Sequence, residues 1–252
     1  LIHGHTTPEE AVEIAHNFAN HVGAQSTAED ALLRRQHLQI TPSSTIVDTA
    51  KIKGANSAYW ALHMLPSESP KDWAASVVLS NFVSEPFYTE LRTKQQLGYI
   101  VGSGGSNSGQ QLQQIFVIQS STHAPDQLRE KAEAFLHTPP ATLDALSEEA
   151  FATLISGARS QIEEKPKSIS EKAAGLFSSA YDFDANWERR ANILTALEHL
   201  TKADIAALRA EMISAETSRS IIVLLAGEPH EVSQAEPSVT SRSDWKAKQD
   251  YR

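Results

Sequence analysis

The sequence contains no cysteine. This absence excludes a disulfide scaffold, a thiolate zinc site and a cysteine nucleophile. It also fits a reducing compartment, so we expect a cytoplasmic protein, with the mitochondrion as the alternative.

Long apolar runs and positive charge are also scarce. No stretch reaches the ~18 apolar residues that a membrane-spanning helix needs, and no signal peptide is visible at the N-terminus. Acidic residues outnumber basic ones by 31 to 22, which leaves a formal net charge of −9. An acidic surface repels phosphate groups, so we expect neither nucleic acid nor a membrane as a partner.

What remains is the composition of a globular protein, with 40% apolar and 21% charged residues. Strand-like patterns at 45–52, 58–65, 99–101, 112–119 and 221–225 are separated by helical ones. This order predicts an α+β fold, a two-layer domain whose mainly antiparallel sheet is covered on one face by helices.

Three details of that sheet follow from the same patterns. We expect 45–52 and 58–65 to pair as antiparallel neighbours, and 99–101 and 112–119 to form a hairpin around a flexible Gly/Ser loop at 102–109. The continuous apolar run at 221–225 is typical of a buried central strand.

The beginning of the chain predicts a domain boundary. Thr7, Pro8 and Glu10 form a helix-start pattern with a capping box. We interpret residues 1–22 as the tail of a preceding homologous domain, 23–44 as a linker with a short helical stretch, and 45–252 as one C-terminal domain.

Known catalytic motifs are missing from the sequence. Neither His-Glu-x-x-His nor its inverted form His-x-x-Glu-His occurs among the ten histidines, and Gly-x-Ser-x-Gly is absent too. We therefore expect no metal site and no nucleophile of these kinds in this chain.

One segment, 86–101, combines chemistry with a helix-to-strand break. A helix from about 86 to 96 would present Arg92, Gly98 would supply the left-handed residue that ends it, and Tyr99 would start a strand. A guanidinium and a phenol could then face one space, where both can donate to a carbonyl or an oxyanion. The alternative is structural: Arg92 neutralises the helix end and Tyr99 fills a half-buried strand position.

The same segment carries a family resemblance. Residues 91–101, Leu-Arg-Thr-Lys-Gln-Gln-Leu-Gly-Tyr-Ile-Val, resemble the C-terminal domain of the M16 zinc metallopeptidases, the family of insulin-degrading enzyme and pitrilysin. Segments 116–120, 165–170, 181–184 and 200–205 follow in that family's order. The resemblance covers nearly the whole chain.

This resemblance implies a clamshell of four α+β domains around a closed chamber, with zinc held by the first domain and none in this chain. It implies that Arg92 binds a substrate carbonyl, that Tyr99 is catalytic through the tetrahedral intermediate, and that Phe87 lies near the same chamber wall as a substrate-binding residue. The implied partners are peptide substrates and upstream M16 domains of the same protein, and a homo-oligomer is left open.

Three functions remain open at this point. The first is the non-zinc-binding portion of a zinc metalloendopeptidase that degrades peptides. The second is a catalytically inactive M16-like subunit that binds peptides or serves a structural role. The third is a separate chain of a nicked or split enzyme.

Overall fold

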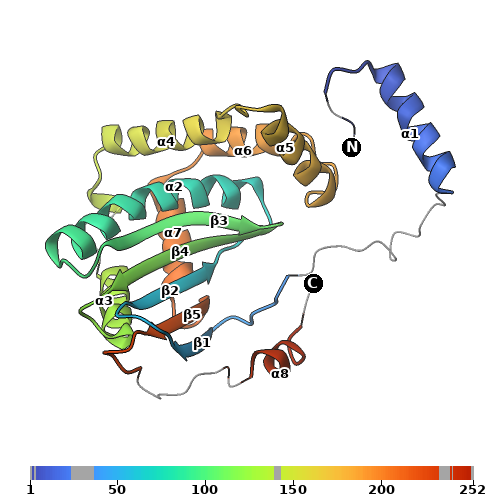
Figure 1. Ribbon diagram of the computed structural model, residues 1–252. Coiled ribbons are helices and arrows are strands. Elements are labelled where there is room, and N and C mark those ends of the chain that lie inside the picture. The colour runs from blue at the N-terminus through green and yellow to red at the C-terminus, as the bar shows by residue number, and fades with distance from the viewer. Residues whose placement is uncertain are drawn as a thin grey trace. The chain divides into compact units, whose positions relative to one another are not determined.

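The computed structural model describes residues 2, 4–23, 37–138, 143–232, 239 and 241–250 (Figure 1). The chain divides into two compact units. One comprises Leu1–Gln36 and Glu164–Trp187, and the other comprises His37–Glu163 and Glu188–Arg252. Each unit is described by itself below.

The first unit contains helices α1 (Pro8–Val22) and α5 (Ile169–Tyr181). The predicted capping box of α1 is confirmed. The Thr7 hydroxyl accepts the Glu10 amide at 3.2 Å, and the Glu10 carboxylate accepts the Thr7 amide at 2.8 Å. Gly23, at a φ of 64°, ends the helix. The helical stretch predicted within the linker lies outside the described residues.

A five-stranded sheet forms the second unit. Its strands are β1 (Ser44–Lys51), β2 (Ser57–Met64), β3 (Ile100–Ser108), β4 (Gln111–Ser120) and β5 (Arg219–Ala226), in the order β1-β5-β2-β4-β3. The predicted α+β class is confirmed, but the sheet is mixed because β5 pairs parallel with β1 and antiparallel with β2.

The pairing predicted between the first two strands is therefore wrong. β5 lies between them. Its alternate side chains Ile222, Leu224 and Ala226 are all buried. An interior position suits such an apolar strand, because neighbours on both sides then accept its backbone hydrogen bonds. The expectation that this run forms a central strand is confirmed.

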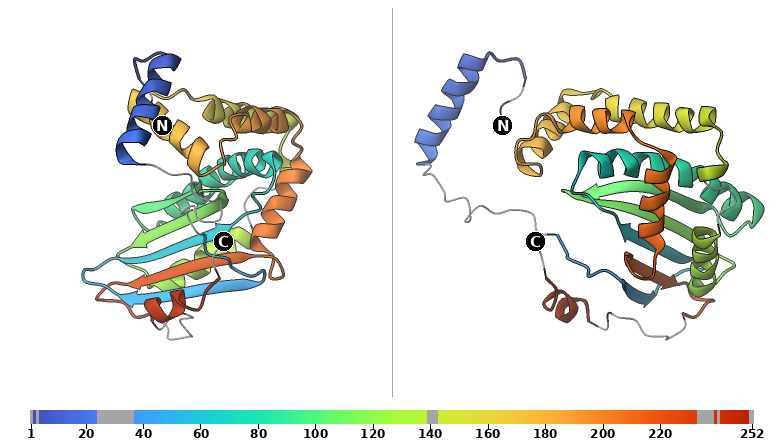
Figure 2. Two further views of the ribbon diagram at one scale, coloured as in Figure 1. Left: turned by 90° about the vertical axis from the view of Figure 1, so that its right-hand side faces the viewer. Right: turned by 180° about the vertical axis from the view of Figure 1, so that it is seen from behind.

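Helices cover one face of the sheet. Helix α2 (Pro70–Tyr88) contacts β3 and β4, and α3 (Pro125–His137) contacts β2 and β5. The helices α4 (Glu148–Glu163), α6 (Arg189–Glu198) and α7 (Lys202–Ile213) contact α2, and the short turn η3 (Leu143–Ala145) contacts α7. Figure 2 shows α2, α4 and α6 on the same side of the sheet. Within the described residues, no helix has the length and apolar character to cross a bilayer.

The opposite face carries a smaller apolar cluster. Leu62 and Met64 are buried there together with Ile40, and Trp60 packs against them. The side chains of β2 alternate between the two faces, because Tyr59 belongs to the cluster under the helices. Ile40 comes from the stretch predicted as a linker, so at least this end of it packs on the sheet.

Candidate functional site

The segment that carries the candidate residues begins inside a long helix. A helix was expected to begin at about residue 86, but α2 begins at Pro70 and runs through Pro86 to Tyr88. The chain then forms a π-helix, η2 (Thr89–Lys94), in which the Gln95 amide donates to the Glu90 carbonyl at 3.0 Å. The helix survives the proline because Phe87 and Leu91 on either side of the junction are completely buried. Wide turns of this kind occur frequently at functional sites.

The chain leaves the π-helix through a tight turn. The left-handed residue is Gln96, at a φ of 54°, and not Gly98 as expected. Gly98 is required for another reason: a Cβ atom there would collide with the carbonyl oxygen of Gln119 on β4. The missing side chain lets this turn lie directly against the sheet, which sets the position of Tyr99.

Arg92 lies between two tyrosine rings. Its guanidinium carbon is 5.1 Å from the ring centroid of Tyr88 and 5.4 Å from that of Tyr99. Its Nε donates to the Tyr99 carbonyl at 3.2 Å. Two ring contacts and one hydrogen bond hold the cation in a defined place, each ring contact contributing about 0.5–1 kcal/mol at an exposed site.

The polar groups of this cluster are available to a ligand. Tyr99 is 85% exposed. Among the described residues, the terminal nitrogens of Arg92 make no further hydrogen bond or ion pair. The structure therefore brings Arg92 and Tyr99 into contact, and of the two only Tyr99 lines the neighbouring cavity.

Among the described residues, neighbouring charges leave Arg92 as the cation of this turn that has no carboxylate partner. Glu90 pairs with Lys94 at 3.1 Å. Hydrogen bonds from Gln95 and then Lys94 lower the pKa of the Glu90 carboxyl, so it stays ionised and neutralises the lysine. An anionic or carbonyl oxygen approaching the turn would meet Arg92.

Phe87 occupies a different environment. Its side chain is completely buried, 5.1 Å from the ring of Phe116 and 5.3 Å from that of Phe135. This burial places Phe87 in the core and removes it from the residues that a ligand could reach. Tyr88 is on the exposed side instead. It was not among the residues selected from the sequence, although its spacing of four residues from Arg92 on a helix is the pattern that indicates such a contact.

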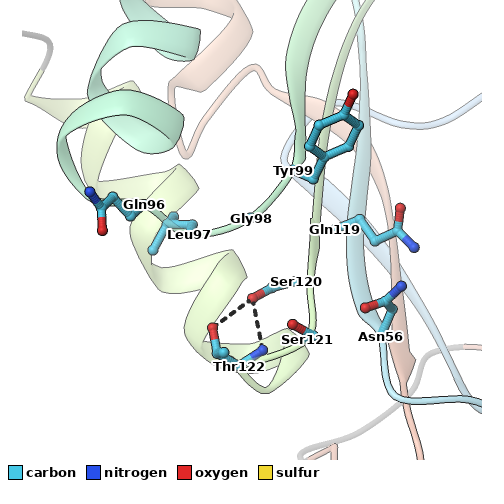
Figure 3. Close-up of a pocket in the computed structure, with 9 residues that line it drawn as sticks. All are labelled: Asn56, Gln96, Leu97, Gly98, Tyr99, Gln119, Ser120, Ser121 and Thr122. Carbon is cyan, nitrogen blue, oxygen red and sulfur yellow. Dashed lines mark hydrogen bonds between the residues drawn. The ribbon is translucent and has the colours of Figure 1, made fainter.

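A cavity of about 300 Å³ adjoins Tyr99 at the end of the sheet (Figure 3). Leu97, Gly98 and Tyr99 form one side of it. The other lining residues carry neutral hydrogen-bonding groups: Asn56, Gln96, Gln119, Ser120, Ser121 and Thr122. Within the part of the chain that the structure describes, no three His, Asp or Glu side chains are grouped so as to hold a metal ion.

Comparisons with known proteins find relatives of this chain. A family model described as PQQ synthase PqqF-like, C-terminal lobe domain 4, matches residues 78–177, which include the π-helix and both candidate residues. Human insulin-degrading enzyme is 27% identical over 227 residues, covering 87% of this chain and 22% of that protein. Protease 3 of Escherichia coli K12 is 25% identical over 210 residues, covering 82% and 21%. These matches indicate a C-terminal part of an M16 peptidase.

Solved structures show the same M16 fold. Pitrilysin superposes with a TM-score of 0.79 at 23% identity, covering 99% of this chain and 27% of that one. The inactive domain of an M16 peptidase from Pseudomonas fluorescens gives 0.62 at 12% identity, covering 91% and 52%. The chain spans about a fifth of the length of the curated M16 relatives that it matches.

Proposed function

We propose that this chain is the substrate-binding, non-zinc-binding portion of an M16 metalloendopeptidase that degrades peptides in a closed chamber. Residues 1–22 would be the tail of the preceding domain, 23–44 the linker and 45–252 the C-terminal domain. The relatives support zinc in the parent enzyme, and a zinc-bound water would supply the attacking oxygen. The protein would act in the cytoplasm, beside upstream M16 domains of the same protein.

The observation that carries the proposal is the clamped guanidinium beside an exposed phenol. Arg92 contacts the Tyr88 ring and the Tyr99 carbonyl, and among the described residues its terminal nitrogens form no hydrogen bond or ion pair. In the proposed complex these nitrogens bind a backbone carbonyl of the peptide, and the Tyr99 hydroxyl donates to the oxyanion of the tetrahedral intermediate. Donors held in place before the charge develops lower the barrier because they need no reorganisation.

The test uses the full-length protein and a short fluorogenic peptide. Tyr99→Phe should lower kcat/KM by about a hundredfold, the usual cost of losing one oxyanion donor. Tyr88→Phe is the matched control: it also removes a hydroxyl from a ring on Arg92, but that hydroxyl has no proposed role, so kcat/KM should stay within about twofold. Unchanged turnover in Tyr99→Phe would remove Tyr99 from the reaction.

A second function is an inactive M16-like subunit, and the likeness to an inactive M16 domain favours it. Such a protein would bind peptides through the same Arg92 but would not cut them. Reading the rest of the coding sequence separates the two: an upstream His-x-x-Glu-His motif supports the enzyme, and its absence supports the inactive subunit.

A further inference from the structure

We propose that the cavity beside Tyr99 is a subsite for one neutral, hydrogen-bonding side chain of the bound peptide, and that a carboxamide, Asn or Gln, fits it best. The identification of the ligand as part of a peptide rests on the proposed function. The chemistry of the ligand rests on the lining of the cavity alone.

The lining carries hydrogen-bonding groups but no charge. Tyr99 is the single titratable residue among those that form the cavity. A carboxylate or ammonium group entering it would lose hydration and find no opposite charge among the lining residues, which is unfavourable. A carboxamide or hydroxyl loses less and can be matched by neutral partners.

Of the three carboxamides in the lining, Asn56 and Gln119 lie near each other and apart from Gln96, so these two can supply those partners (Figure 3). Within the described residues, the side chains of Asn56 and Gln119 form no hydrogen bond or ion pair. Each offers a carbonyl acceptor and an NH2 donor. A carboxamide of the ligand can therefore pair with both in complementary fashion, donating to one and accepting from the other.

The strand register gives these two residues a common face. Gln119 of β4 is paired with Ala58 of β2 on one side and with Ile100 of β3 on the other. Asn56 comes two residues before Ala58, so alternation along an extended chain directs it to the same face. Figure 3 shows the carboxamides of Asn56 and Gln119 near each other, with Ser121 beside Asn56.

Hydrogen bonds hold the loop that follows Gln119. Ser120 is 2% exposed, and its hydroxyl accepts the Thr122 amide at 3.2 Å. It also lies 3.3 Å from Nδ1 of His123. The Ser120 and Thr122 hydroxyls already bond to one another, which leaves Ser121 and the two carboxamides to contact the ligand. Asn56 and Gln119 offer both donors and acceptors, so they would set the preference for a carboxamide. A volume near 300 Å³ is at the small end for ligand sites, as expected for one side chain.

The experiment is a titration of the full 252-residue chain, labelled with ¹⁵N, with the N-acetyl, N-methylamide derivatives of glutamine, glutamate, lysine and leucine. The glutamine probe should shift the side-chain NH2 signals of Asn56 and Gln119. The Kd of the glutamine probe should be at least about fivefold lower than that of the glutamate probe. The reason is that the cost of burying the unpaired carboxylate of glutamate exceeds the gain from one hydrogen bond.

Gln119→Glu keeps the size of the side chain and adds one negative charge. In this variant the lysine probe should bind more tightly than the glutamine probe. Gln113→Glu is the matched control, because Gln113 lies on the same strand and face, paired with Met64, but does not line the cavity. This control should keep the preference of the unmodified chain.

Three results would overturn the proposal: equal affinity for the glutamine and glutamate probes, shifts confined to residues outside the cavity, or the same change of preference in both variants. Probe binding needs no hydrolysis, so its outcome is independent of the kcat/KM test. Glutamine selectivity with unchanged turnover in Tyr99→Phe would leave the cavity as a peptide site while the catalytic role of Tyr99 fails.

Discussion

Gly98 shows how one absent side chain can set the geometry of a site. It lies against the carbonyl of Gln119, where a Cβ atom has no room, and it immediately precedes Tyr99. A side chain there would push the turn away from β4 and move the Tyr99 carbonyl that Arg92 Nε contacts. The position therefore links backbone packing to the candidate site.

Gly98→Ala should lower the free energy of unfolding by about 2 kcal/mol, because backbone atoms rather than a flexible side chain must move. Urea denaturation would measure it. Gly102→Ala is the matched control: nothing lies within 4 Å of its Cβ position, so stability should stay within about 0.5 kcal/mol. Equal stability of the two variants would show that the turn moves freely.

His63 is a second residue whose environment has a measurable consequence. It is 8% exposed, and its ring nitrogens have no hydrogen-bond partner among the described residues. Burial lowers the pKa of His63 to about 4, while the backbone of Met212 and the charge of Glu133 act weakly in the opposite direction. In the unfolded chain the pKa of a histidine is about 6.5.

At a pH between about 4 and 6.5, the unfolded chain binds more protons at His63 than the folded chain does. His63 therefore causes stability to fall as the pH drops from about 6.5 to 4, by about 2 kcal/mol between pH 7 and 5. We expect His63→Leu to lose this part of the pH dependence in urea denaturation. His16→Leu, at an exposed position of α1, should keep it. An identical pH profile in His63→Leu and the unmodified chain would contradict the assignment.

At the scale of elements, α2 and η2 close the outer edge of the sheet. Side chains spaced by four or eight residues reach the backbone of the edge strand β3. The Gly105 amide donates to the Ser80 hydroxyl at 2.7 Å, the Ser84 hydroxyl donates to the Ser103 carbonyl at 3.0 Å, and Arg92 reaches Tyr99. These bonds occupy groups that an added strand would need.

The contacts from α2 to β3 also explain why residues 102–108 form a strand. Their glycines and serines had led us to expect a flexible loop. Small side chains let β3 approach α2, since a Cβ at Gly105 would already lie 3.3 Å from the side chain of Ser80. Pairing with β4 on the inner side and the serines on the outer side satisfies the backbone.

Ser80→Ala should speed hydrogen exchange of the Gly105 amide by about fivefold to tenfold, the effect of one lost hydrogen bond of about 1 kcal/mol. Ser76→Ala is the control, because the Ser76 hydroxyl bonds to Trp73 within its own helix. Unchanged exchange at Gly105 in Ser80→Ala would mean that the serine does not protect the edge.

At the scale of the whole molecule, the C-terminal segment returns to the beginning of the sheet unit. Arg242 of α8 (Arg242–Lys246) donates from Nε to the Asp48 carboxylate on β1 at 2.9 Å. The Gln39 amide donates to the Asp250 carbonyl at 2.9 Å. Two parts of the chain some 200 residues apart in sequence are joined by these contacts.

Arg242→Gln should increase deuterium uptake of the peptide covering 242–250 by about twofold to fivefold, because an exposed ion pair contributes up to about 1 kcal/mol. Lys248→Gln removes the same charge from the same segment without touching Asp48, and uptake should not change. Equal uptake in the two variants would show that the ion pair does not hold α8.

The sequence by itself determined the class of the fold, the capped helix starts and the meeting of Arg92 with Tyr99. Each depends on residues close together in the chain, where spacing and local hydrogen bonds decide the outcome. The motif 91–101 also led to the M16 family.

Tertiary structure decided the rest. The insertion of β5 between β1 and β2, the continuation of α2 through Pro86 and the strand at 102–108 all depend on contacts between distant segments. The burial of Phe87 and the exposure of Tyr88 have the same origin, because adjacent residues of a helix point in different directions and the packed core determines which one it covers.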